Sequence, residues 1–166
     1  MNICRILLTI SALAYGFTPA LVDLGDGHIF NDLWAPHARF HGVWLLSTLA
    51  AMGAWVLILC WHKSGRAVDR LRTASVLGLI ALGTFFVATF AMGAYGGSLS
   101  DEVGEGLILG LNGNVVVFAI ALVIQAGAAV IAWTQLGEDI PFTGTVLPTS
   151  KSSAKLPVGL KKINIV

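Results

Sequence analysis

The sequence predicts an all-α integral membrane protein, built as an antiparallel four-helix transmembrane bundle with both termini in the cytoplasm. The 166-residue chain is 56% hydrophobic and 11% charged, whereas soluble domains carry roughly 25% charged residues. Its charges fall in short clusters that leave four apolar runs, and about 17 to 25 such residues in a helix span a bilayer. Because the runs are joined by short connections, neighbouring helices are expected to be antiparallel.

We expect a transmembrane domain over residues 1–136, with spans at about 5–22, 38–61, 73–95 and 107–134. The first span starts like a signal peptide, but its apolar run continues through Tyr15 and Phe17, which favours a retained helix. Pro19 cannot donate a backbone hydrogen bond and should bend or end this helix. Pro36 suits the first position of the second helix, where a missing N–H has no cost.

The last two spans are expected to pack through small residues. Gly93 and Gly97 form one small-xxx-small pair, and Gly106 and Gly110 form another. Such pairs let membrane helices approach closely. They predict either tight packing of the third helix on the fourth or contact with a second copy of the chain.

Residues 137–166 differ in composition from the spans. Pro141, Pro148 and Pro157 interrupt a segment rich in Ser, Thr and Lys, which argues against a long helix. We expect an extended or flexible cytoplasmic tail at the membrane surface.

The basic residues predict the orientation. Four of them, Lys63, Arg66, Arg70 and Arg72, lie around the connection between the second and third spans, and four more lie in the tail. Only Arg39 falls on the opposite side. The positive-inside rule therefore predicts N-in and C-in topology, in a bacterial inner membrane.

A polar cluster, DLGDGHIFNDLWAPHARFH, occupies residues 23–41 between the first two spans. His37 and His41 are four residues apart and share one helix face, and His28 on the preceding loop can fold back toward them. With a carboxylate from Asp23, Asp26 or Asp32, three imidazoles could bind a divalent transition metal such as zinc, copper or iron. The alternative is a structural polar cap at the membrane interface.

Four other polar or aromatic residues, Asn31, Arg39, Trp44 and Asn114, are candidates for the same cap or for ligand contact. Arg39 points away from the two helical histidines, and could pair with Asp32, Asp101, Glu102 or Glu105 or bind an anionic ligand. Trp44 continues the histidine face. Asn114 shares a face with Gln125, and both amides should point into the bundle, toward Thr84 or Thr89 among others. They would act as interhelical hydrogen bonds or line a cavity for a lipid-like ligand.

The segment HIFNDLWAPHARFHGVW, together with the four spans, resembles a family of small, uncharacterised four-helix membrane proteins with an Asn-x-x-Trp followed by Pro-His-Ala-x-Phe-His. The resemblance implies that His28, Asn31, Pro36, His37 and His41 belong together. It implies no activity.

These observations favour a binding or accessory role, in which the protein holds a lipid-like ligand, a metal ion or a larger membrane complex. One alternative is a membrane enzyme with a histidine-based metal site for a lipid or quinone-like substrate; another is a structural subunit. Expected partners are membrane lipids, other membrane subunits or a second copy, and no nucleic acid. The predicted span interiors contain no charged residue, which argues against a proton pump or an ion-coupled transporter.

Overall fold

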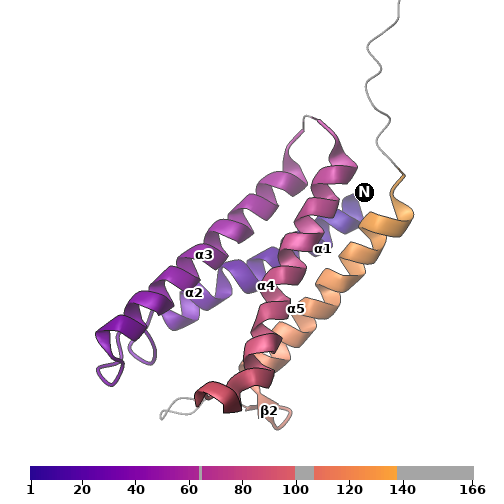
Figure 1. Cartoon of the computed structure of the whole chain (residues 1–166). Helices are drawn as coiled ribbons and strands as arrows, with labels where there is room; N and C mark the ends of the chain where they lie inside the picture. Colours follow the sequence, from indigo (N-terminus) through magenta and orange to yellow (C-terminus); the bar gives the residue numbers. More distant parts are fainter. Residues whose placement is uncertain (64, 100–106, 138–166) are drawn as a thin grey trace, which may run out of the picture.

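The computed structural model describes residues 1–63, 65–99 and 107–137. Within these residues, four helices are long and apolar enough to cross a membrane: Asn2–Asp23, Pro36–Trp61, Ala67–Tyr95 and Gly113–Gln135. They pack against one another (Figure 1), so the predicted all-α arrangement of four long apolar helices is confirmed. The tail lies outside the described residues except for Gly137, and the orientation across the membrane stays a prediction.

The first span is divided in two, as Pro19 predicted. Helix α1 (Asn2–Gly16) ends before Phe17, and the short helix α2 (Thr18–Asp23) follows. Phe17 has φ −112° and ψ −34°, which departs from regular helix geometry. Since Pro19 has no N–H, the ladder is interrupted here, and the Thr18 hydroxyl donates to the Leu13 carbonyl at 3.3 Å.

Helix α3 (Pro36–Trp61) begins at the predicted proline. Helix α4 (Ala67–Tyr95) begins six residues before the expected span start at residue 73. Its first turns are charged and carry an Arg66–Asp69 ion pair at 2.8 Å. The expected start was placed where the uncharged run begins. An uncharged run indicates only the membrane-spanning part of a helix, and the helix itself can extend beyond that part.

The expected start of the fourth span at residue 107 is wrong. Residues 107–112 form a hairpin of β1 (Leu107–Ile108) and β2 (Leu111–Asn112), and helix α5 runs over Gly113–Val130. The hairpin turns through Leu109 and Gly110, both at positive φ. The Asn112 side chain then caps α5 by accepting from the Asn114 N–H at 3.0 Å. A π-helical turn, η1 (Ile131–Gln135), ends the helix.

The two ends of the bundle are packed differently. We call the end with the 62–66 turn the basic end, and the end with residues 24–35 and the β1–β2 hairpin the hairpin end. The core extends from the basic end and includes Cys4, Leu8 and Ala12 of α1, Val56 and Cys60 of α3, Leu71 and Ala74 of α4, and Ala128 of α5. Among the described residues of α4, none after Leu82 is buried, and none of α5 before Ala121 is buried.

Helices α3 and α4 lie close at the turn that joins them and diverge toward the hairpin end (Figure 1). Helix α1 packs against α3, α4 and α5. Helices α1 and α3 approach each other closely at Gly16 and Gly53: a Cβ on Gly16 would lie 3.0 Å from the Gly53 Cα and 3.1 Å from the Leu49 carbonyl oxygen. Small residues therefore set this crossing.

Of the four glycines that were expected to pack the third span on the fourth, the three that the structure describes do not meet the facing helix. A Cβ on Gly93 or Gly110 would meet nothing within 4 Å in the described structure, and Gly106 lies outside it. A Cβ on Gly97 would overlap the Tyr95 ring, which is two residues away in sequence. Spacing alone did not identify the glycines that meet another helix.

Candidate functional site

A cavity of about 440 Å³ lies at the hairpin end, where α3 and α4 diverge. Four helices line it: α2, the first half of α3, the second half of α4 and the first turns of α5. The volume falls in the range of roughly 300–1,000 Å³ that is typical of ligand pockets. The scarcity of buried residues in the described parts of α4 after Leu82 and of α5 before Ala121 agrees with a cavity between these segments.

The walls of the cavity are mostly apolar. Phe85 of α4 and Phe118 of α5 stack on each other with ring centroids 4.2 Å apart and planes 21° apart, and both line the cavity. Leu46 and Ala81, which are 6% exposed, also line it. This lining fits a hydrocarbon chain or a flat apolar ring.

Four lining residues are polar: Thr18, Asp23, Thr84 and Asn114. Asn114 was expected to form an interhelical hydrogen bond or, alternatively, to line a cavity for a lipid-like ligand, and it is among the residues that line this cavity. Asp23 was considered as a metal ligand, and its place is on the cavity wall at the end of α2. The Thr84 hydroxyl donates to the Ala81 carbonyl at 3.0 Å, as Thr18 donates to Leu13.

The two helical histidines lie together on α3. His37 Nε2 and His41 Nε2 are 3.0 Å apart, and the Trp44 ring stacks on His41 at 5.9 Å between centroids. All three side chains are exposed, and the shared face predicted from their spacing is confirmed. None of them is among the residues that line the cavity.

His28 has a different environment. Its ring lies edge-on to Trp34, with centroids 6.4 Å apart. Within residues 1–63, 65–99 and 107–137, no group of three or more His, Cys, Asp or Glu side chains has the arrangement of a metal site. Within the described part of the chain, the structure thus brings together two of the three predicted histidines and shows no cluster of three metal ligands around them.

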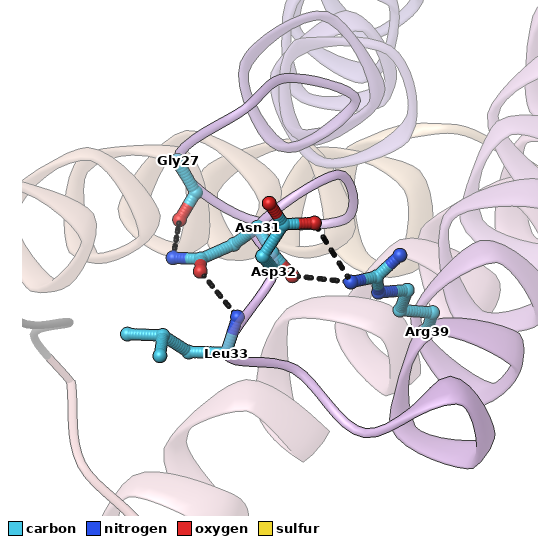
Figure 2. Close-up of polar contacts among 5 residues, drawn as sticks. All are labelled: Gly27, Asn31, Asp32, Leu33 and Arg39. Carbon is cyan, nitrogen blue, oxygen red and sulfur yellow. Dashed lines mark hydrogen bonds and ion pairs between the residues drawn. The ribbon is translucent and has the colours of Figure 1, made fainter.

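Asn31 and Arg39 organise the connection before α3 (Figure 2). The Asn31 side chain donates to the Gly27 carbonyl at 3.3 Å and accepts from the Leu33 N–H at 2.9 Å. Arg39 Nη2 donates to the Asn31 carbonyl at 2.8 Å and lies 3.6 Å from Asp32 Oδ1. The predicted Arg39–Asp32 pair is present, whereas Asp101, Glu102 and Glu105 lie outside the described residues. These contacts form a structural cap.

Gln125 is fully buried on α5, and its Nε2 donates to the Ser75 carbonyl of α4 at 2.8 Å. For Gln125 the expected threonine partners are wrong, because its amide donates to Ser75, while Thr84 and Thr89 donate to carbonyls of their own helix. The amide lies where a Cβ on Gly78 would be. A glycine opposite a buried amide is the sequence signal that could have indicated this contact.

Sequence reasoning missed Thr18 and Phe85 as lining residues, and it considered Thr84 only as a hydrogen-bond partner of the amides on the last span. Each has an ordinary place in an apolar helix, and no local pattern distinguishes it. A second hollow of about 430 Å³ at the basic end is lined only by residues of α4 and Trp133 of η1. The cavity at the hairpin end is therefore the stronger candidate site.

Residues 7–140 match the model of a family described as a family of unknown function, DUF6640. The match covers every residue that lines the cavity at the hairpin end. No curated protein and no solved structure matches the chain. The predicted resemblance to an uncharacterised membrane protein family is thus confirmed in part. The matching family has no known function, and the chain has four candidate membrane spans.

Proposed function

The chain belongs to this family, DUF6640, and on that premise we propose that it is a small four-span membrane protein that binds one lipid-like amphiphile in the cavity at the hairpin end. The single observation that carries the proposal is the cavity itself, with its apolar walls and a few polar groups. Ligand pockets commonly combine these two features.

The exposure of the lining residues supports access from the bilayer. Leu45, Val22 and Val117 line the cavity and are 58%, 59% and 39% exposed. In a membrane, side chains with this exposure would contact lipid. A lipid-like molecule could therefore reach the cavity sideways, between the diverging helices, without crossing water.

A binding role is better supported than a metal-dependent enzyme. The pair His37 and His41 supplies two imidazoles on the outer surface of α3, away from the cavity lining. A catalytic zinc site uses three protein ligands. The polar contacts of Asn31 and Arg39 are accounted for by the cap.

The test uses photoreactive hexadecyl probes with different head groups, incorporated with the purified full chain into phosphatidylcholine vesicles. We expect a probe to label residues that line the cavity. Ala88→Phe places a ring in the cavity beside Phe85 and should reduce labelling about tenfold, which corresponds to about 1.4 kcal/mol.

Ala91→Phe is the matched control, because Ala91 is exposed on the same helix and does not line the cavity. It should label like the unmodified chain. Equal labelling of the two phenylalanine variants, or no labelling of lining residues by any probe, would exclude the proposed function.

A further inference from the structure

We propose that the hollow at the basic end binds one anionic phospholipid, with the lipid phosphate at Arg72 and an acyl chain along α4. This inference goes beyond the proposed function, because the hollow and the cavity lie at opposite ends of the bundle. The residues that line the hollow are Asp69, Arg72, Thr73, Val76 and Leu77 of α4 and Trp133 of η1. Their order along α4, and the way in which Arg72 is held, support the proposal.

The lining of the hollow changes from polar to apolar along one face of α4. The three polar residues come first, and Val76 and Leu77 follow about one turn later, toward the middle of the helix. Residues spaced by three and four share a helix face, and a rise of 1.5 Å per residue spreads this face over about 12 Å. Val76 and Trp133 are 42% and 55% exposed, so in a membrane they would contact lipid. A molecule with a polar head and an apolar chain matches this order.

The guanidinium group of Arg72 is held in place by η1. Its Nε donates to the Ala132 carbonyl at 3.1 Å, and its Nη2 donates to the Leu136 carbonyl at 3.5 Å. The guanidinium carbon lies 5.2 Å from the centroid of the Trp133 ring, whose Nε1 donates to the Ser75 hydroxyl at 3.1 Å. Nη1 makes no hydrogen bond among the described residues, so it can donate to a phosphate oxygen. Because the group is already fixed, binding a phosphate costs little ordering of this side chain.

The charges at the hollow favour an anionic head group. Asp69 lines the hollow, but Arg66 Nε lies 2.8 Å from Asp69 Oδ2, so this carboxylate is already paired. The guanidinium groups of Arg66 and Arg72 and one carboxylate together leave one net positive charge. The Thr73 hydroxyl donates to the Asp69 carbonyl at 2.9 Å, so a phosphate would take its hydrogen bonds from Arg72. Basic pockets beside membrane helices are typical sites for anionic lipid head groups.

The test measures lipid binding to the purified full chain in detergent by native mass spectrometry, with dioleoylphosphatidylglycerol and dioleoylphosphatidylcholine as probes. The two lipids share their acyl chains and a phosphate, but only phosphatidylglycerol has a net negative charge. We expect phosphatidylglycerol to bind about fivefold more tightly, the size expected for one basic residue facing an anionic lipid. Inorganic phosphate at millimolar concentration should not displace the lipid, because it has no acyl chain; displacement would indicate a site for free phosphate and overturn the inference.

Two arginine variants test the role of Arg72. Arg72→Gln should abolish the preference for phosphatidylglycerol. Arg70→Gln is the matched control, because Arg70 also donates to backbone carbonyls at the basic end, those of Leu59 and His62, and does not line the hollow. It should keep the preference. Equal affinities of the unmodified chain for the two lipids, or loss of the preference in both variants, would overturn the inference.

Two tryptophan variants test the place of the acyl chain and leave Arg72 intact, so they decide the matter if Arg72→Gln does not fold. Val76→Trp fills the hollow and should weaken phosphatidylglycerol binding about fivefold or more. Ile80→Trp should bind like the unmodified chain, since Ile80 is exposed one turn later on α4 and does not line the hollow. Ala88→Phe, which fills the cavity at the hairpin end, should also keep the preference. Equal weakening by Val76→Trp and Ile80→Trp, or loss of the preference in Ala88→Phe, would refute binding at the basic end.

Discussion

The crossing of α1 and α3 gives the sharpest prediction about stability. Gly16 and Gly53 bring the two backbones together, and an alanine Cβ at Gly16 would lie 3.0 Å from the Gly53 Cα. A Cβ at Gly53 would lie 3.1 Å from the Ala12 carbonyl oxygen. Because these neighbours are backbone atoms, no side-chain rotation can relieve the overlap.

Two effects set the magnitude for Gly16→Ala. Carbon atoms pack best about 3.5–4.0 Å apart, so the helices must separate by roughly 0.5–1 Å, which weakens every contact along the crossing. Overpacking of this kind costs about 1–3 kcal/mol. The better helix propensity of alanine offsets up to about 1 kcal/mol of that cost. With the full offset, we therefore expect a net loss of about 0–2 kcal/mol.

The assay is reversible unfolding by sodium dodecyl sulfate in mixed micelles, followed by tryptophan fluorescence. Gly127→Ala is the control, since a Cβ there meets nothing within 4 Å of the described structure, and it should be neutral or stabilising. The double variant Gly16→Ala/Gly53→Ala should lose less than the sum of the single losses, because one helix separation relieves both overlaps. If the unfolding free energies of Gly16→Ala and Gly127→Ala were equal, the close contact between α1 and α3 at Gly16 would be refuted.

Two further predictions concern polar contacts. Gln125→Met keeps the side-chain volume and loses the hydrogen bond to Ser75. It also removes the buried Oε1, which has no hydrogen-bond partner in the described structure. Because these two effects oppose each other, the unfolding free energy of the variant should change by under about 1.5 kcal/mol. Gln125→Ala leaves a void and should lose about 2–5 kcal/mol in the same assay; equal losses would contradict this account. Arg39→Ala removes a charged donor from the Asn31 carbonyl, a bond of about 1.5–3 kcal/mol, and should speed amide hydrogen exchange in residues 28–34 about tenfold or more. Asp32→Asn should leave exchange nearly unchanged because that carboxylate is fully exposed, and a larger effect for Asp32→Asn would refute the ranking.

Local features of the fold were predictable because their causes are local. Pro19 interrupts the first span, Pro36 begins α3, and the spacing of His37 and His41 places them on one face. The start of α5 was not predictable from hydropathy, because Leu107, Ile108 and Leu111 are as apolar in a hairpin as in a helix. There, the turn at Gly110 and the cap at Asn112 decide the structure.

The candidate site was predictable only in part. The polar cluster at residues 23–41 stood out by composition, and the structure divides its members among different tasks. Asn31 and Arg39 hold the connection, His37 and His41 pair on the surface, and Asp23 lines the cavity. These residues are close in the sequence, but their side chains point in different directions and therefore do not form one site.

Four apolar helices, the places where Pro19 and Pro36 break or begin them, and the charges at each end can all be predicted from the amino-acid sequence. Those properties depend on the composition and hydrogen bonding of short segments. The contact between Gly16 and Gly53 and the cavity at the hairpin end became evident only when the helices were seen packed together. Helix packing depends on contacts between residues that are far apart in the chain. Because hydropathy is a property of each segment alone, it does not indicate which residues of two helices will meet.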